Sequence, residues 1–395
     1  MSNLPILGAL ALGYAPLIDR QRMVIATRLT VFPLRPDVSA ADLLTAVAEV
    51  WPPGGARAVL NVLNEALLLD LLGAAPSSNL MIEVPAFMAG DPARAEALLA
   101  LKASGTTLLL KGVPAQPLPP AVLGAFKYAV LEPADEARAP TSLPRLHTGL
   151  RSAAAIEASF QAGVQGVFGW PMAGAFDAPA NNANTAKTAK ADVAADLQVI
   201  VELMSRLDQG DDVERLEQTL KRDPSLAFKL LRFLNSAAFG LPVEVSSFRH
   251  AIMLLGYSRL KRWLALLLTT ASKDHTMRPI MFAALRRGLL MEELASSMDD
   301  AEMRDEMFIC GLFSLLDHML KQPFDKLLGA IPMPERVRQA LVESTGQFQP
   351  YLELVLAIEQ ESVHDVKSAA DALMLDAANI NPCMLRALAK AAQLE

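Results

Sequence analysis

The chain has 395 residues, of which 52% are hydrophobic and 20% are charged, and its formal net charge is -7. This length allows two or three domains at roughly 100–200 residues each, and the apolar content is enough for a sizeable core. The acidic balance argues against sequence-independent binding of nucleic acid, because such binding needs a basic surface.

Two cysteines, Cys310 and Cys383, lie in apolar helical sequence and provide neither a disulfide framework nor a CxxC zinc site. This usage suits a reducing cytoplasm. The apolar N-terminus has no Lys or Arg before Arg20, so we expect a strand there rather than a secretory signal. Apolar runs such as WLALLLTTA are much shorter than the roughly 20 residues of a membrane-spanning helix. We expect a cytoplasmic protein without membrane insertion.

Short apolar strands alternate with helical patterns through the first part of the chain. Such alternation predicts a parallel sheet, either open or closed into a barrel. The part is short for a complete eightfold barrel, which typically takes about 250 residues, so we expect a trimmed TIM-barrel-like domain with a missing or degraded unit. The predicted strands are 6–14, 23–32, 79–85, 106–113, 127–133 and 164–168, and the predicted helices are 40–50, 58–72, 92–103, 119–126 and 151–162.

The texture changes after a segment that is rich in Ala, Asn, Thr and Lys and shows no apolar period. Beyond it, apolar residues recur with a helical period, and Asp223-Pro224 gives a cap followed by proline at the first helical position. The sequence therefore predicts an α/β domain at 1–175, a linker at 176–194 and an all-α domain at 195–395.

One run in the second part carries a specific motif set. It reads DPSLAFKLLRFLNSAAFGLPVEVSSFRHAIMLLGYSRLKRWL, from Asp223 to Leu264. It resembles the HDOD family, with its DP-x-L start, KLL-x-x-x-NSA-x-FG centre and S-x-x-x-AI-x-LLG end. HDOD domains look like HD-type metal phosphohydrolases that have lost their metal ligands. The resemblance implies an all-helical bundle that acts as a signalling or scaffolding module in bacteria.

The first part is similar in strand order, spacing and tandem layout to a degenerate EAL domain, the fold that linearises cyclic di-GMP. The whole chain thus resembles EAL-HDOD tandem signalling proteins of the YuxH-like family. EAL enzymes hold divalent metals with carboxylates and an asparagine at the carboxyl ends of strands. On this resemblance Arg28 stands at the signature glutamate, Glu83 at the asparagine, Lys111-Gly112 at the paired aspartates and Glu132 near the aspartate of the K-x-D motif. These residues imply a lost metal site.

The degenerate rim suggests a local hypothesis. Glu83, Lys111 and Glu132 are predicted to lie at strand ends on one rim, where Lys111 would take the metal's place as a fixed cation between two carboxylates. The alternative is three solvated charges, which would contribute little.

The stretch GLFSLLDHML, from Gly311, raises the same question in the second part. HD phosphohydrolases carry G-L-L-H-D there, and the His and Asp bind metal. The matching positions in this chain are Ser314 and Leu315, so the resemblance implies that the helix provides packing. Asp317-His318 comes slightly later in reversed order, and its side chains point about 100° apart on a helix. His364-Asp365 is interpreted as a surface helix start.

Two further groups are candidates for a ligand or partner site. Asn235 and Ser236 form either a polar pocket or helix caps. A basic stretch from residue 249 to 263 would bind an anionic partner, or it is a solvated helix face. Its candidate residues are Arg249, His250, Arg259 and Arg262.

Taken together, the sequence predicts a non-catalytic bacterial signalling protein with no cofactor and no bound metal. The HDOD domain would bind signalling proteins, and the degenerate EAL domain would regulate or dimerise. Cyclic di-GMP and a second copy of the chain remain open as partners. The alternatives are a metal-independent cyclic di-GMP receptor and a residual metal-dependent phosphodiesterase or phosphohydrolase.

Overall fold

The computed structural model describes residues 4–138, 142–172, 199–221, 248–270, 277–298, 300–320, 324 and 333–394. It divides into two compact units, one of residues 1–173 with 353–389 and one of residues 174–352 with 390–395. This division differs from the predicted 195–395 domain, because residues 353–389 pack with the first unit. The predicted linker, 176–194, lies outside the described residues.

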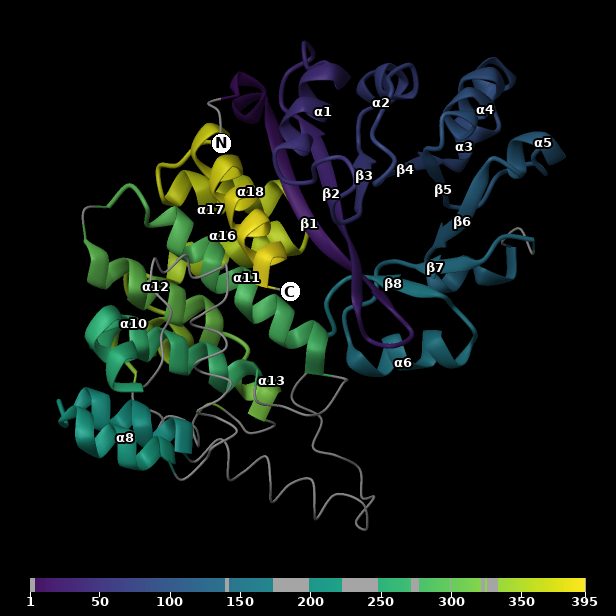
Figure 1. Cartoon of the computed structure of the whole chain (residues 1–395). Coiled ribbons are helices and arrows are strands. Elements are labelled where there is room, and N and C mark those ends of the chain that lie inside the picture. The colour runs from purple at the N-terminus through teal and green to yellow at the C-terminus, as the bar shows by residue number, and fades with distance from the viewer. Residues whose placement is uncertain are drawn as a thin grey trace. The chain divides into compact units, whose positions relative to one another are not determined.

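The first unit is built on a closed eight-stranded barrel with the strands in sequence order (Figure 1). β1 pairs antiparallel with both β2 and β8, while every other neighbouring pair is parallel. The strands are β1 (Leu10–Asp19), β2 (Val24–Pro33), β3 (Ala58–Val62), β4 (Leu80–Pro85), β5 (Thr107–Lys111), β6 (Phe126–Leu131), β7 (Arg145–His147) and β8 (Gly166–Phe168).

The ring of strands is complete, so the short domain does not come from a missing strand. Instead, β1 and β2 are joined by a tight turn at residues 20–23, in which Arg22 has a positive φ of 63°. β7 and β8 have only three residues each. The barrel therefore saves chain length in one connection and two strands.

Residues 58–72 are where the predicted elements differ most from the structure. The predicted helix is wrong at its start, because residues 58–62 form β3 and only Glu65–Leu72 is helical. Asn64 separates the two, since its side chain accepts a hydrogen bond from the Leu67 backbone N–H and caps the helix. β7 was not predicted either.

Inward side chains fill the barrel in three layers, because alternate residues of a strand face the same side. The middle layer is apolar and comprises Leu17, Ala26, Val59, Met81, Leu109, Val130, Leu146 and Phe168. Two residues toward the amino ends lies a polar layer with Arg57, Asn79, Thr107 and Tyr128. Two residues toward the carboxyl ends lies a charged layer with Arg28, Asn61, Glu83 and Lys111.

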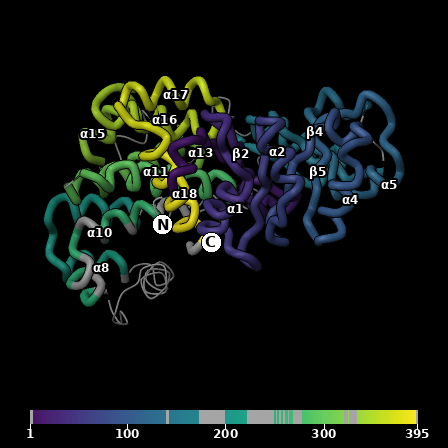
Figure 2. The backbone as a smooth tube through the Cα atoms, turned by 90° about the horizontal axis from the view of Figure 1, so that it is seen from above, coloured from purple at the N-terminus to yellow at the C-terminus, as the bar shows by residue number. Residues whose placement is uncertain are grey.

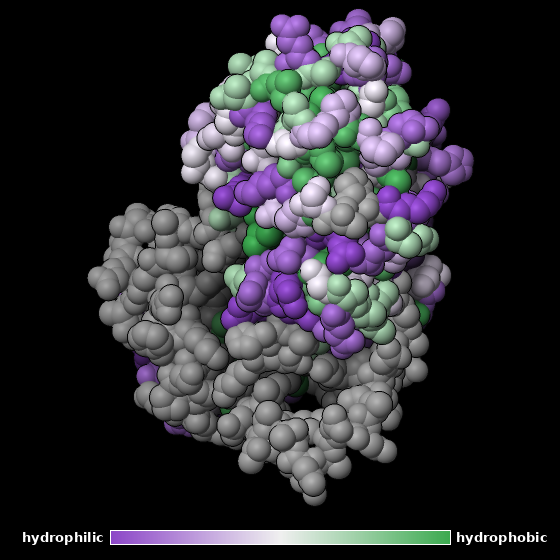
Figure 3. Space-filling view, turned by 90° about the vertical axis from the view of Figure 1, so that its right-hand side faces the viewer, coloured by the Kyte–Doolittle hydropathy of each residue, from purple (hydrophilic) through white to green (hydrophobic). Residues whose placement is uncertain are grey.

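Helices cover the outside of the barrel (Figure 1). They are α1 (Ala40–Ala48), α2 (Glu65–Leu72), α3 (Ala86–Ala89), α4 (Ala95–Ala103), α5 (Pro120–Leu123) and α6 (Ala153–Gln161). Ser39 and Ser152 cap α1 and α6 by accepting backbone N–H groups. On the barrel side that carries α4 and α5, hydrophilic and hydrophobic residues are mixed (Figure 3).

C-terminal helices complete the first unit. They are the later part of α16 (Gln349–Glu359), α17 (Val363–Ala372) and most of α18 (Ala377–Leu394). α18 lies beside the start of the chain in both views (Figure 1, Figure 2). Asn381, which is 2% exposed, donates hydrogen bonds to the carbonyls of Leu7 and Leu10 at 2.7 and 2.8 Å. These bonds satisfy backbone groups that burial would otherwise leave unpaired.

The described residues of the second unit form helices, as predicted. Among these are α8 (Val213–Lys221), α10 (Phe248–Thr270), α11 (Arg278–Leu294), α12 (Ala301–Phe313), α13 (Leu316–Leu320) and α15 (Glu335–Arg338). α11 and α12 touch closely at Gly311, where an added Cβ would lie 2.5 Å from the carbonyl oxygen of Arg287. Gly311 is therefore a packing residue, as the sequence indicated for this helix. No helix among the described residues combines the length and apolarity that a bilayer crossing requires.

Candidate functional site

The carboxyl-end layer of the barrel brings together charged side chains from neighbouring strands. Arg28 comes from β2, Asn61 from β3, Glu83 from β4 and Lys111 from the end of β5. Each follows an apolar residue of the middle layer by two positions, so the strand period points all four into the barrel mouth. Below we call these four side chains the rim network.

Glu83 is the centre of the rim network and is only 1% exposed. Its Oε2 lies 2.8 Å from Nη2 of Arg28, which is 4% exposed, and 3.8 Å from Nζ of Lys111. One buried carboxylate is therefore held between two cations. Burying the charges of Arg28 and Glu83 costs desolvation energy, and removing either one would leave the other as an unpaired buried charge.

Asn61 links Lys111, the lysine that pairs with Glu83, to Thr30 on the neighbouring strand β2. Its Oδ1 accepts a hydrogen bond from Lys111 Nζ at 2.7 Å, and its Nδ2 donates to Thr30 Oγ1 at 3.0 Å. The amide thus fixes where the ammonium lies. The resemblance to EAL enzymes placed their asparagine at Glu83, but the structure offers an asparagine one strand earlier, on the β3 strand that the sequence did not predict.

A second carboxylate reaches the rim network from the C-terminal part of the chain. Glu361 lies in the turn between α16 and α17, accepts a hydrogen bond from Thr30, and lies 3.5 Å from Nη1 of Arg28. Glu361 has a positive φ of 55°, an unusual backbone state for a residue with a side chain. Gly13 makes room for this turn, because an added Cβ there would lie 3.0 Å from Cα of Glu361.

The pKa values of Arg28 and Lys111 are shifted in opposite directions. Burial by itself would lower the pKa of Arg28, but the charges of Glu83 and Glu361 outweigh it and raise the pKa above its ordinary value. Burial is also the main influence on Lys111, and it lowers the pKa of that side chain despite the attraction of Glu83. The nearby Arg28 lowers it further. Arg28 is thus a permanent cation, while Lys111 holds its proton less firmly than an exposed lysine.

The rim network does not fit the divalent metals that the EAL resemblance implies. A divalent cation needs several oxygen ligands that are free to face it, whereas Oε2 of Glu83 faces the guanidinium of Arg28 and the ammonium of Lys111, which leaves the buried Oε1 as the one carboxylate oxygen of Glu83 without a hydrogen-bond partner. Among the described residues, no group of three or more His, Cys, Asp and Glu side chains is placed to hold a metal ion. The arrangement instead provides internal charge pairing.

The predicted cluster around Lys111 is therefore correct for one of its two carboxylates. Lys111 pairs with Glu83, but Glu132 is exposed just beyond β6, and within the described residues it has no ion pair with Lys111. The sequence missed Thr30, Asn61 and Glu361. For Asn61 the signal was present, because an inward asparagine two residues after Val59 repeats the spacing of Arg28 and Glu83.

The lost HD position in the second unit also faces a cation. Ser314 Oγ donates to the Gly311 carbonyl at 2.7 Å and accepts a hydrogen bond from Nη1 of Arg287 at 3.0 Å. Arg287 is 5% exposed and Leu315 is 2% exposed. The helix that carries GLFSLL thus packs against α11 through Gly311 and Ser314.

The predicted basic stretch is distributed into ion pairs. Arg249 Nη2 lies 3.0 Å from Glu214, and both Nη atoms of Arg262 lie 2.6 Å from Glu292. Arg262 also stacks on Phe308, with 3.9 Å from Cζ to the ring centroid. His250 is partly buried. Asn235, Ser236 and the side chain of Arg259 lie outside the described residues.

The two dipeptides that contain His and Asp are local features. His318 Nδ1 lies 2.9 Å from the Asp317 carboxylate, so the adjacent residues pair with each other. His364 is exposed in the first turn of α17, whose cap is Ser362. The interpretation of His364-Asp365 as a surface helix start is confirmed.

Comparison with known proteins identifies the second part of the chain. Residues 194–320 match the profile of the HDOD domain family. This part of the chain is an HDOD domain. The predicted HDOD resemblance is confirmed, and its start at residue 194 lies next to the predicted boundary at 195.

Two curated relatives cover larger parts of the chain. The uncharacterized protein YuxH of Bacillus subtilis is 31% identical over 191 residues, which are 47% of this chain and 46% of YuxH. The cyclic di-GMP phosphodiesterase CdgJ of Vibrio cholerae is 26% identical over 176 residues, which are 45% of this chain and 41% of CdgJ. The matched region spans less than half the length of each relative.

Solved structures similar to this chain are EAL proteins. A PaMucR phosphodiesterase in complex with c-di-GMP has 12% identity and a TM-score of 0.32, and the match covers 42% of this chain and 91% of that one. A standalone EAL protein from Vibrio cholerae O395, in its c-di-GMP bound form, has 15% identity and a TM-score of 0.30, with coverages of 44% and 96%. The barrel itself is defined by the pairing of its eight strands.

Proposed function

We propose that this chain is a non-catalytic signalling protein, in which the HDOD domain binds a protein partner and the degenerate EAL-like barrel regulates that binding. The observation that carries the proposal is the rim network. The place where the EAL resemblance requires divalent metals holds Arg28 and Lys111 around the buried Glu83. Binding rather than turnover is the chemistry that such a paired set supports.

The energetics of the rim network favour this assignment. A metal ion that used both oxygens of Glu83 would have to displace Arg28 from Oε2, and one bound through the unpartnered Oε1 would still lie near two fixed positive charges. Breaking a buried ion pair by removing one partner typically costs about 3–5 kcal/mol. Coordination by one carboxylate and one amide does not compensate for that cost, because hard divalent cations take six or more oxygen ligands.

The HDOD domain supports the same proposal with an independent contact. The first of the two metal-binding positions of HD phosphohydrolases is Ser314, whose hydroxyl accepts a hydrogen bond from the guanidinium of Arg287. The second is Leu315, which cannot ligate a metal. In both units a cationic side chain thus contacts the position at which the related enzymes bind a metal.

A hydrolysis assay on the full chain tests the proposal. Purified protein is incubated with cyclic di-GMP in Mg²⁺ and in Mn²⁺, and linear product is measured by chromatography. We expect no product above the rate without protein. Turnover that the Glu83→Gln variant abolishes would contradict the proposal, and the control variant Glu132→Gln separates the network carboxylate from an exposed rim carboxylate.

A metal-free cyclic di-GMP receptor is the second candidate, and the partial exposure of Lys111 favours it. The Lys111 side chain is 29% exposed at the barrel mouth, so a phosphate could reach its ammonium. Glu361 opposes this, because its carboxylate already neutralises Arg28 from the outer side. Calorimetric titration with cyclic di-GMP without metal decides the matter. A receptor would bind, and Glu361→Gln would bind more tightly than the wild type, whereas a protein-binding module would give no heat with either chain.

A further inference from the structure

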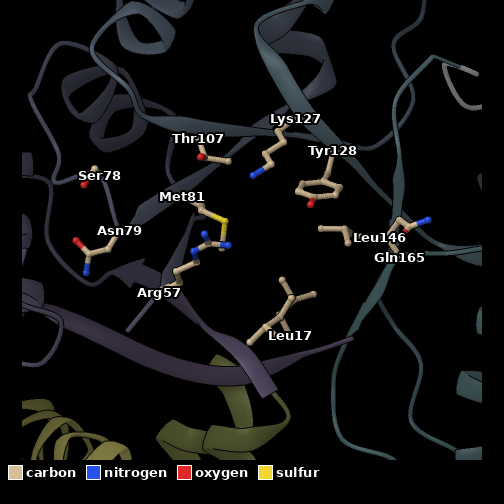
Figure 4. A pocket seen from close by; sticks show the side chains of 11 residues that line it. Leu17, Arg57, Ser78, Asn79, Met81, Thr107, Lys127, Tyr128, Leu146 and Gln165 are labelled. Atoms are coloured by element: carbon tan, nitrogen blue, oxygen red, sulfur yellow. The ribbon is translucent and has the colours of Figure 1, made fainter. Parts of the chain in front are cut away.

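The amino-end layer of the barrel, opposite the rim network, contains a small cavity of about 90 Å³. Its charged and hydroxyl-bearing walls come from the starts of several strands. Arg57 precedes β3, and Lys127 and Tyr128 lie near the start of β6. In Figure 4 the guanidinium of Arg57, the ammonium of Lys127 and the phenol of Tyr128 point toward a shared space. We infer that this cavity, here called the amino-end cavity, binds a small oxyanion, a phosphate group or a carboxylate.

The residues that line the amino-end cavity favour an anion because of their charge. Two cations line the amino-end cavity, and no Asp or Glu side chain is among its lining residues. Among the ion pairs of the described residues, neither Arg57 nor Lys127 takes part in one. Lys127 lies near an aromatic ring, with its Nζ 5.6 Å from the Tyr128 ring centroid. Two cations directed at one space repel each other, and an anion between them would remove that repulsion.

The hydrogen-bond donors that line the cavity also favour an oxyanion. The arginine provides a planar fork of N–H donors, the lysine a compact ammonium, and Tyr128 a hydroxyl. These groups match the oxygens of a phosphate or carboxylate better than they match a neutral ligand, because charge-assisted hydrogen bonds are about twice as strong as neutral ones. Ser78 and Thr107 add hydroxyl groups to the same wall.

The floor of the cavity limits the size of the ligand. Leu17, Met81 and Leu146 close it toward the barrel centre, and they belong to the apolar middle layer. The amino-end cavity is thus separated from the rim network by a layer of packed side chains. Its volume is several times the roughly 10–15 Å³ that one ordered water needs. It admits a compact anionic head, and any larger body of the ligand would extend outward to solvent.

The amino-end cavity is cationic although the chain as a whole is acidic. Its formal net charge is -7, and most other arginines of the barrel described above pair with carboxylates, as Arg28 and Arg22 do. Arg57 and Lys127 are exposed instead, so the opening is accessible to a dissolved anion. This inference does not depend on the function proposed for the rim network.

The test is a phosphorus NMR titration of inorganic phosphate with the full chain at low ionic strength. We expect saturable broadening that fits one site. The Arg57→Gln/Lys127→Gln variant should raise the dissociation constant by about tenfold or more, since it removes two charge-assisted contacts. Arg35→Gln, which removes an exposed cation beyond the opposite end of β2, is the matched control and should bind as the wild type does.

Competition then assigns the oxyanion. Acetate that displaces phosphate at comparable concentration identifies a carboxylate site, and glycerol phosphate that displaces it better than acetate identifies a phosphate monoester site. Absence of saturable broadening overturns the inference, as does equal affinity in the double variant. Both substituted side chains are exposed, so circular dichroism is expected to confirm an unchanged fold.

Discussion

A buried arginine defines the chemistry of the barrel mouth. Arg28 contacts Glu83, lies 3.2 Å from Thr148 Oγ1, and places its Cζ 5.0 Å from the Phe168 ring centroid. A guanidinium needs several acceptors at once when it is buried, because it cannot lose its proton. The sequence identified Arg28, Glu83 and Lys111 as inconsistent with a metal site. It could not reveal that Glu361, more than 300 positions later, would complete their charge balance.

Removing Arg28 tests how strongly the rim network stabilises the barrel. In Arg28→Met, Glu83 stays buried and loses its closest cation, so we expect the free energy of unfolding to fall by about 3–5 kcal/mol. Urea unfolding followed by circular dichroism measures the change. The double variant Arg28→Met/Glu83→Met should recover most of it, because the two most deeply buried charges are removed together, and the charges that lose a partner, Lys111 and Glu361, are partly exposed.

The matched control for Arg28→Met is an exposed arginine of the same barrel unit. Arg138 pairs with Asp135 three residues earlier, and its side chain is 70% exposed. Arg138→Met is expected to cost less than about 1 kcal/mol, as exposed pairs usually do. Equal losses for Arg28→Met and Arg138→Met would mean that the rim network contributes no more than a surface pair.

Contacts between elements are harder to read from sequence than the elements themselves. The alternation of strands and helices predicted most of the barrel, because apolar runs such as those of β4 and β5 are buried on both faces. The error at 58–72 has a physical cause. Leucines in that run satisfy a helical spacing, and only pairing with β2 and β4 decides that its first five residues extend. β7, with three residues, carries too little pattern to be detected.

The contact between β7 and α6 predicts a pH effect. His147 is 1% exposed, and its Nδ1 lies 3.0 Å from Ser159 Oγ on α6. Ser159 donates to the Ala155 carbonyl, so the histidine donates to Ser159 through Nδ1. Burial lowers the pKa of His147 below its ordinary 6.5, although Glu136 opposes that shift. The folded chain therefore keeps this imidazole neutral at a pH where the unfolded chain protonates it.

The sign of the effect follows from proton linkage. Below pH 6.5 the unfolded state binds a proton that folded His147 does not, so stability falls as pH decreases through that range. Each unit of pKa depression corresponds to about 1.4 kcal/mol. Unfolding free energies at about pH 7 and pH 5 should differ less in His147→Gln than in the wild type. His364→Gln removes an exposed histidine and should keep the wild-type difference; a wild-type difference in His147→Gln would refute the assignment.

At the scale of the whole molecule, chain order and packing order differ. Composition alone indicated a boundary near residue 175, and the HDOD domain begins close to the predicted position. Composition could not indicate that residues 353–389 pack with the first unit. A helical period shows that a helix has an apolar face, but it does not show which surface covers that face. The roles of Asn381 and Gly13 follow only from the structure, which packs residues 353–389 against the start of the chain.

This packing makes a prediction about cleavage of the chain. A protease site introduced between residues 180 and 190 divides the chain into an N-terminal and a C-terminal fragment. If residues 353–389 belong to the barrel unit, both fragments should remain associated after cleavage and elute together from a sizing column.

Asn381→Ala should weaken the association, because the carbonyls of Leu7 and Leu10 lose their donor, at a cost of about 1–3 kcal/mol for each buried group left unsatisfied. Arg138→Met, away from this contact, is the control and should leave the fragments together. Separate elution of the wild-type fragments would mean that residues 195–395 fold as an independent domain, in which case Glu361 would not be available to the rim network and Arg28 would keep Glu83 as its ion-pair partner.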